Sequence, residues 1–312
     1  MGNTEPVQSF RHTRRVLSRA VGGADPFRPL EPECRVIQFS QPLSLPDLRK
    51  AGDLLRGRSD VQLYVYGQAD QDLDFLEYFT GLKRLQVALY ELDDVRGLVH
   101  VASTLEEFTF GQTKKTFSLR FLENLSQLNA LFLAGHKKDL AAIAAARDIT
   151  RLGLSMITLP DLSPLLPLSN LTDLSILLGG TRDLALLPRF EKLKKMMLMR
   201  VTKMSDLGVL ADLRRLEKLH LDWMRDVVSL PSLAPLTSLT SVKLDTMKGL
   251  GDLDAIAAAP MLEELSLVNM PQLNVASFRC LAGHPHLKKL WARVGRAKVN
   301  NAVKEMFPGI AR

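Results

Sequence analysis

The sequence predicts an α/β solenoid, in which short strands stack into a parallel sheet and short helical or 3-10 segments line the outer side. Two observations predict this fold: the spacing Leu-x-x-Leu-x-Leu recurs along the chain, and a second set of apolar residues three apart follows many of the copies. Alternating apolar residues over five or six positions indicate a strand with one buried face, and a three-residue period suits a 3-10 turn. One such coil cannot bury its apolar edge alone, whereas stacked coils can.

The strand repeats are regular enough to be counted. The clearest copies read LNALFL at 128–133, LEKLHL at 216–221 and LEELSL at 262–267. With the weaker copies included, successive first positions from residue 60 to residue 287 are separated by 22, 23, 23, 21, 22, 22, 23, 23, 23 and 25 residues. A looser copy begins at Cys34. So narrow a period over so long a stretch is typical of repeat architecture.

The pattern resembles that of leucine-rich-repeat proteins with repeats of roughly 22 residues, of the bacterial internalin-like or phosphatase-regulator-like class. The resemblance covers about residues 34–295 and implies a horseshoe with a parallel sheet on its concave side. The family usually places Asn or Cys a few residues past each strand, where it bonds to the backbone of the next coil. The corresponding positions here are Tyr90, Thr113, His136, Val201, Met224, Met247 and Met270. We therefore expect apolar packing to replace most of that polar ladder.

We predict three segments along the chain: a flexible basic leader over 1–33, a solenoid of about 11–12 coils over 34–295, and a C-terminal helical cap over 296–312. The leader carries five arginines but lacks the apolar core of a secretory signal. In the cap, apolar residues from Val299 to Phe307 follow helical spacing and are expected to close the end of the stack. Among the outer segments, the alanine-rich stretch 139–148 is predicted to be the most strongly helical.

Composition bears on where the protein works. No apolar stretch approaches the 18 or so residues of a membrane span. The two cysteines, Cys34 and Cys280, lie about ten coils apart, which is on the order of 45–50 Å at the usual strand spacing. A disulfide needs Cα atoms within about 7 Å. We therefore expect free thiols and a reducing, cytoplasmic compartment. The resemblance implies a bacterial protein, and we expect it to be monomeric.

The search for catalytic chemistry finds little. The sequence has no Gly-rich phosphate loop and no nucleophile elbow, and His284-Pro-His286 is a poor metal site because no further Cys or His is near it. His220 and Asp222 alternate with buried leucines and should point from the same strand face, about 6–7 Å apart. That pair supplies no nucleophile and no oxyanion donors. We expect a non-enzymatic protein without a cofactor or metal. The alternative is an enzyme with its active site on the concave face, and loss of turnover in a His220→Ala variant would reveal it.

Residues that alternate with the buried leucines should form the concave surface and bind a partner protein there. One region combines large apolar side chains with a charged rim, the usual anatomy of a protein-binding hot spot. Its predicted partner-binding residues are Leu177, Lys195, Met197, Met199, Arg200, Lys218, His220, Asp222, Trp223, Lys243 and Asp245. Tyr64 and Tyr66 form a smaller second candidate. The competing interpretation is that Met197 and Met199 are covered by neighbours and that Trp223 turns into the coil.

The net charge of +7 suggests a second function. Residues 284–312 carry seven Lys or Arg and one acid, Glu305. A solvated cap is one interpretation, and a binding site for acidic partners, either nucleic acid or an anionic membrane, is the other. We rank nucleic acid behind a protein partner, because only Trp291 in this segment could stack on a base.

Overall fold

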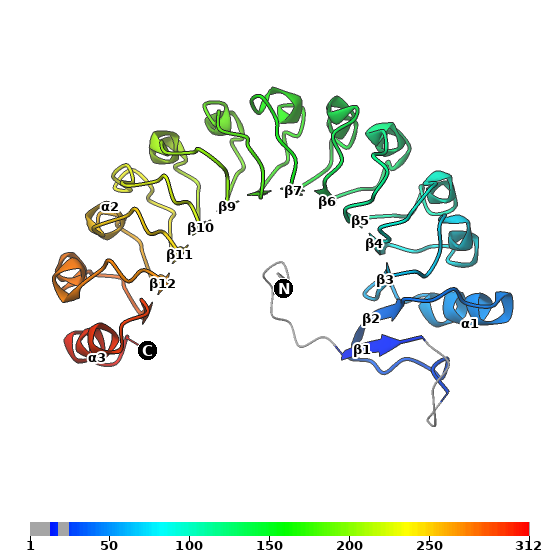
Figure 1. The fold of residues 1–312 in the computed structure, drawn as a ribbon, viewed down its shortest axis with the longest axis horizontal. Coiled ribbons are helices and arrows are strands. Elements are labelled where there is room, and N and C mark those ends of the chain that lie inside the picture. Colours follow the sequence, from blue (N-terminus) through cyan, green and yellow to red (C-terminus); the bar gives the residue numbers. More distant parts are fainter. Residues whose placement is uncertain (1–12, 18–24, 312) are drawn as a thin grey trace. The chain divides into compact units, whose positions relative to one another are not determined.

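The repeated segments form parallel strands joined by short outer segments (Figure 1). A computed structural model describes residues 13–17 and 25–311. The chain falls into two compact units, the N-terminal unit Met1–Leu128 and the C-terminal unit Asn129–Arg312. The boundary lies inside the predicted repeat region, and both units contain repeats.

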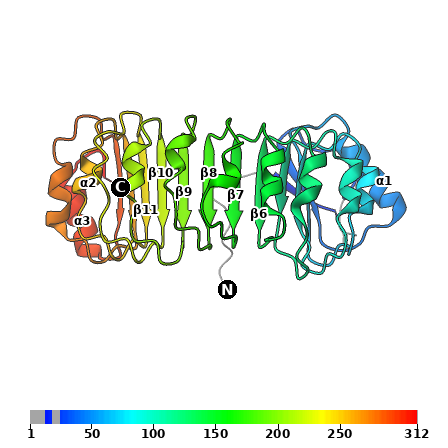
Figure 2. The same cartoon turned by 90° about the horizontal axis from the view of Figure 1, so that it is seen from above.

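In each unit the strands pair in sequence order and in parallel, as each coil returns beside the one before it. The N-terminal unit contains β1 (Thr13–Val16), β2 (Cys34–Phe39), β3 (Gln62–Tyr66), β4 (Arg84–Ala88) and β5 (Glu107–Phe110). The C-terminal unit contains β6 (Ala130–Ala134), β7 (Arg151–Ser155), β8 (Asp173–Leu177), β9 (Lys195–Met199), β10 (Lys218–Asp222), β11 (Ser241–Asp245), β12 (Glu264–Val268) and β13 (Lys289–Arg293). Figure 2 shows β6 to β11 side by side. These strands and their parallel pairing confirm the predicted solenoid class within each unit.

The outer segments are mostly 3-10 helices. In the N-terminal unit they are α1 (Leu45–Leu55), η1 (Asp74–Tyr78), η2 (Arg96–His100) and η3 (Leu119–Asn124). In the C-terminal unit they are η4 (Leu140–Ala145), η5 (Ser163–Leu165), η6 (Leu187–Arg189), η7 (Gly208–Asp212), α2 (Asp254–Ala257), η8 (Val275–Leu281) and α3 (Ala297–Met306). The prediction for the alanine-rich stretch 139–148 was wrong, since it forms the 3-10 helix η4. Six residues span less than two α-helical turns, and packing overrides so weak a propensity.

The core lies between the strands and the outer segments of each coil. The inward strand positions are buried; Leu219 and Leu221, for example, are at most 1% exposed. After strands β6 to β12 the residues two places past the strand are buried as well, and Val201, Met224, Met247 and Met270 are no more than 3% exposed, whereas Tyr90 after β4 is 53% exposed. Apolar packing therefore occupies four of the seven positions named above, Val201, Met224, Met247 and Met270, while Thr113 and His136 are buried polar residues and Tyr90 is exposed.

A backbone ladder runs along the loops that follow the strands of the C-terminal unit. Immediately after each strand from β6 to β12, one residue adopts positive φ: Gly135, Met156, Leu178, Arg200, Trp223, Thr246 and Asn269. Each of their N–H groups donates to the carbonyl of the last residue of the next strand, at 2.8–3.0 Å. This left-handed turn aims the following residue inward, so that the buried apolar position two places past the strand can be filled.

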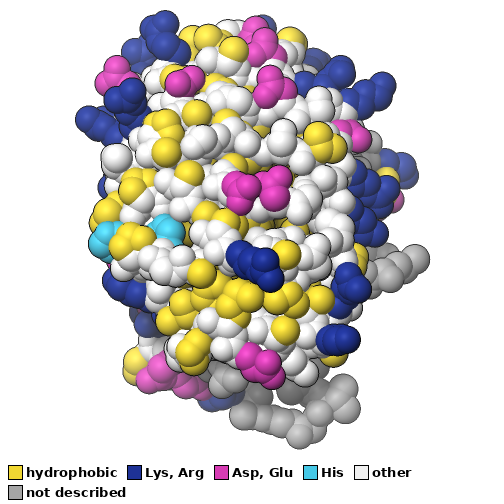
Figure 3. All heavy atoms as spheres, turned by 90° about the vertical axis from the view of Figure 1, so that its left-hand side faces the viewer, with side chains coloured by type: hydrophobic (Ala, Val, Ile, Leu, Met, Phe, Trp, Pro, Cys, Tyr) yellow, Lys and Arg dark blue, Asp and Glu magenta, His cyan; other side chains and the backbone are white. Residues whose placement is uncertain are grey.

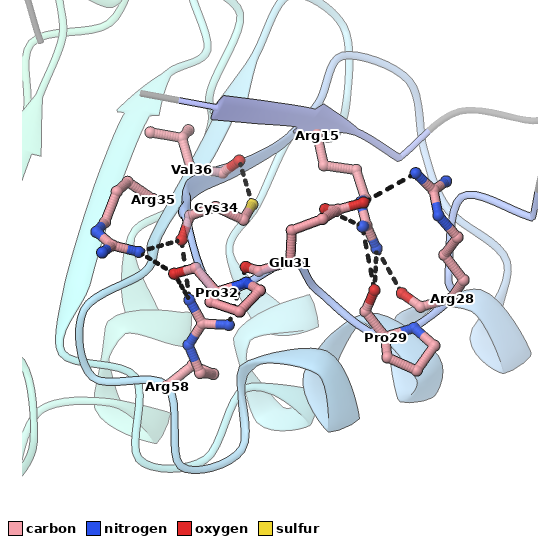
Figure 4. A network of polar contacts seen from close by, with 9 residues as sticks. All are labelled: Arg15, Arg28, Pro29, Glu31, Pro32, Cys34, Arg35, Val36 and Arg58. Atoms are coloured by element: carbon pink, nitrogen blue, oxygen red, sulfur yellow. Dashed lines mark hydrogen bonds and ion pairs between the residues drawn. The ribbon is translucent and has the colours of Figure 1, made fainter. Parts of the chain in front are cut away.

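Part of the predicted basic leader belongs to the sheet of the N-terminal unit. Strand β1 pairs with β2, and Arg15 is only 7% exposed. Its guanidinium donates to the carbonyls of Arg28 and Pro29, the latter at 3.1 Å, and pairs with Glu31 (Figure 4). Arg15 therefore has a structural contact that a count of positive charges in the leader does not reveal. The other parts of that leader, 1–12 and 18–24, lie outside the described residues.

The last residues close the sheet at β13. In α3, Val299 and Val303 are buried, as is Phe307 immediately after it. The N–H of Leu290 in β13 donates to the carbonyl of Ile310 at 2.8 Å. The C-terminal segment thus covers apolar side chains and satisfies a backbone donor of the terminal strand.

Candidate binding surface

Strands β8 to β11 bring most of the predicted site residues into columns. In register across β9, β10 and β11, three columns run Lys195–Lys218–Ser241, Met197–His220–Lys243 and Met199–Asp222–Asp245. Because all three columns point from the same face, side chains from different coils lie next to one another at about the strand spacing of 4.8 Å. Alternation in the sequence predicted these columns correctly.

The apolar centre of this surface is smaller than predicted. Leu177 is buried, with 6% exposure, so its prediction as an exposed residue was wrong. It stands in register between Ser155 and Met199, and close neighbours on both sides shield a leucine from water. Met197 and Met199 are half-buried, whereas Trp223 is 38% exposed. Trp223 is therefore the most exposed of the large apolar side chains predicted for this site.

Trp223 is held between two coils by cation–π contacts. The guanidinium carbon of Arg200 lies 4.7 Å from the centre of the indole ring, and that of Arg225 lies 5.4 Å from it. Arg200 and Trp223 occupy equivalent places in the backbone ladder of positive-φ residues, where their N–H groups donate to the carbonyls of Asp222 and Asp245. The backbone therefore directs the indole outward and keeps it from turning into the coil.

His220 is a half-buried, neutral side chain in the middle of the columns. Burial lowers its pKa to about 4, and the neighbouring Lys243 lowers it further than Asp245 raises it. Its Nε2 atom is buried and has no hydrogen-bond partner. A histidine in this state is an acceptor or donor that a bound partner could satisfy, and it is uncharged at neutral pH.

Asp222 and Asp245 are in-register neighbours on the same face. Burial raises the pKa of Asp222, and repulsion from Asp245 raises it further, against the smaller lowering effects of Lys243 and Arg200. The hydroxyl of Thr246 donates to Asp245 at 2.8 Å. The two carboxylates form an acidic spot beside the cations, with no arrangement that would activate a nucleophile.

The second candidate, Tyr64 and Tyr66, lies on β3 in the N-terminal unit. The two rings stack with centroids 4.9 Å apart and an interplanar angle of 21°, and both side chains are half-buried. Burial raises the pKa of Tyr64, and proximity to Tyr66 adds to this. Stacking along one strand uses ring surface that a partner would otherwise contact, so this pair offers less free apolar area than the sequence suggested.

The basic C-terminal segment is partly neutralised by the preceding coil. Lys288 pairs with Glu263 at 2.6 Å, and Lys289 pairs with Glu264. In Figure 3 acidic and basic side chains are interspersed on the side of the molecule that faces the viewer. The net charge of a sequence window therefore overstates the positive potential, because the balancing acids come from the coil one repeat earlier.

Three further features of the described residues bear on function. Over 13–17 and 25–311, three or more His, Cys, Asp or Glu side chains nowhere gather in a way that could hold a metal ion. None of the helices in that same part of the chain has the length and hydrophobicity needed to cross a bilayer. Cys34 and Cys280 are both free, and burial is the main cause that raises the pKa of the Cys280 thiol to about 11.

Sequence reasoning missed Lys203 and Arg225. Both lie in the loops after β9 and β10, beside Arg200 and Trp223. The only sequence signal is that they stand three or four places past a strand, where the chain has left the alternating pattern. Predicting their proximity to Trp223 would have required the left-handed turn to be known.

Comparison with known proteins supports the fold. No family model matches the chain, and a search of curated proteins finds no match. Among solved structures, the chain is similar to an internalin (inlF) of Listeria monocytogenes, with a TM-score of 0.56 and 21% identity, over 82% of this chain and 72% of that one. It is also similar to the leucine-rich-repeat protein LIC12759 of Leptospira interrogans, with a TM-score of 0.52 and 15% identity, over 91% and 92% of the two chains.

A third similar structure is that of the Toll–Spatzle complex of Drosophila, with a TM-score of 0.53 and 17% identity. The match covers 83% of this chain and 36% of that one. At these identities the likeness concerns the fold. The protein thus has the leucine-rich-repeat fold, which the sequence resemblance implied and the parallel strands of both units display.

Proposed function

We propose that this protein is a non-enzymatic interaction module that holds a partner protein on the face of strands β9 to β11. The observation that carries the proposal is the exposed Trp223, fixed by two arginines next to half-buried methionines and a charged rim. Tryptophan and arginine are the residues most enriched in binding hot spots. Side chains mounted on paired strands are preorganised, so little conformational entropy is lost on binding.

The alternative of a catalytic site on this face has less support. His220 and Asp222 lie on one strand, but no nucleophile hydrogen-bonded to His220 is described, and its Nε2 has no partner.

We also propose that the protein is monomeric and works in a bacterial cytoplasm. The free cysteines agree with a reducing compartment, and trapping of both thiols in a native lysate would test it.

An affinity pull-down from native lysate tests the proposed surface. The bait variant Trp223→Ala with Lys218→Ala removes the exposed ring and an exposed cation, and both changes leave the core intact. The control variant Val228→Ala with Met261→Ala removes exposed apolar side chains outside the strand columns. We expect wild type and control to retain a partner that the Trp223 variant loses, with all three baits showing the same circular dichroism spectrum.

Equal capture by all three baits would contradict the proposed surface. The basic segment 284–312 would then become the next candidate, and neutralising Arg293 and Arg296 would test it, because binding to a polyanion is strongly salt-dependent.

A further inference from the structure

A shallow basic pocket adjoins Trp223 at the ends of β9 and β10. It has a volume of about 320 Å³ and is lined by residues of the two loops: Arg200, Val201, Thr202, Lys203, Trp223, Arg225 and Asp226. Three cations and one carboxylate therefore surround the space.

Several other cations of the same unit form cross-coil ion pairs: Lys194 with Glu217 at 2.8 Å, Lys195 with Asp173 at 2.8 Å, and Lys288 with Glu263 at 2.6 Å. Within the described part of the chain, Arg200, Lys203 and Arg225 have no such pair within 4.0 Å, although the charge of Arg200 acts weakly on Asp222. Like charges brought together without an internal counter-ion are a complementary surface for an external anion.

The indole explains how the cations are held in place. Both guanidinium groups lie over the ring of Trp223, at 4.7 and 5.4 Å from its centre. A guanidinium that uses its face on an aromatic ring keeps its N–H donors at the edge, where they can bind a carboxylate. The left-handed conformation of Arg200 and Trp223 brings both side chains to the same end of the strands.

We propose that this pocket receives an acidic segment of the partner protein, with a carboxylate bound by Arg200 and Arg225 and an apolar neighbour packed on the exposed part of Trp223. The inference rests on the proposed function and adds the chemistry of the partner. A long polyanion fits less well, because it would extend from the pocket over Asp222 and Asp245 on the adjoining strands. These two acids would repel a nucleic acid or an anionic bilayer, whereas a short acidic segment meets only Asp226 among the three cations of the pocket.

The test is selection from a library of random displayed peptides against full-length baits. The test variant is Arg200→Gln with Arg225→Gln, and the control is Arg214→Gln with Arg215→Gln, two exposed arginines of the same unit in the segment before β10. We expect wild type and control to enrich peptides rich in Asp and Glu, and the test variant to lose that enrichment. The best acidic peptide should bind the test variant at least about tenfold more weakly than the control.

Other outcomes separate the two proposals. Enrichment of peptides without acidic residues, or equal binding by the test variant, would overturn the acidic-segment inference while the proposed function stands. Failure of wild type to enrich any peptide would overturn the inference, and the lysate pull-down would still decide the proposed function. If a phosphoserine in place of the acidic residue binds more than about tenfold tighter, the pocket recognises phosphate and the carboxylate assignment is wrong. Should the double variant fail to fold, Lys203→Gln, an exposed change, replaces it.

Discussion

At the scale of single residues, the half-buried His220 couples the stability of the folded protein to pH. Its pKa of about 4 lies below the usual 6.5, chiefly because burial disfavours the charged imidazolium, with Lys243 adding repulsion and Asp245 a smaller attraction. The folded protein therefore binds this proton less tightly than the unfolded chain does. Stability from this group is complete above pH 6.5 and is lost as the pH falls toward 4.

A His220→Leu variant should accordingly lose less stability on acidification than wild type. Between pH 7 and pH 5, urea unfolding should show a drop in unfolding free energy that is smaller by about 1 kcal/mol, a value reduced for the partial exposure of the ring. The exposed His286→Leu change in the same unit is the matched control. If wild type and His220→Leu responded to pH identically, His220 would titrate normally and would not be desolvated.

At the scale of elements, the backbone ladder after strands β6 to β12 directs some side chains into the core and others to the surface. An L-residue in this conformation costs about 1–2 kcal/mol relative to the right-handed helix region, and glycine occupies only the first place of this series, Gly135. The cross-coil bond from each N–H offsets part of that cost. Because of this turn, the residue that follows each positive-φ residue reaches the core, and the side chains of Arg200 and Trp223 lie next to each other on the surface.

Asn269 allows the cost of this turn to be measured, since its side chain is exposed and its φ is 52°. Asn269→Val should destabilise the protein by about 1 kcal/mol, because a β-branched residue tolerates positive φ poorly. Asn269→Gly should change stability by less than about 0.5 kcal/mol. Equal unfolding free energies for the two variants, measured by urea titration, would mean that the turn carries no conformational strain.

At the scale of the whole molecule, each coil depends on its neighbours for a buried edge. In the C-terminal unit the last such edge is covered by α3 and by the bond from Leu290 to Ile310. In a stack of this kind, damage at one end is felt most strongly by the nearest coils. A buried change in the middle, such as Leu219→Ala, should instead cost roughly 2–5 kcal/mol through lost packing.

Replacing Val303 and Phe307 by alanine should therefore unfold the terminal coils first. Hydrogen exchange should accelerate most at β13 and β12 and least at β6 and β7. Lys304→Ala, an exposed change on the same helix, should leave the exchange pattern unchanged. Uniform acceleration across β6–β13 would show that the unit unfolds as a single block and that α3 is no local cap.

The sequence by itself determined the repeat, the strands, their inward face and the columns of side chains, because the two-residue period of a strand leaves no freedom in which residues share a face. Residues such as Lys195, His220 and Asp222 could thus be placed correctly. Only the tertiary structure decided the burial of Leu177, the partners of Arg15 and Lys288, and the convergence of Arg200, Lys203 and Arg225 on Trp223. Those properties depend on contacts between residues far apart along the chain and on loop dihedrals, which local periodicity does not encode.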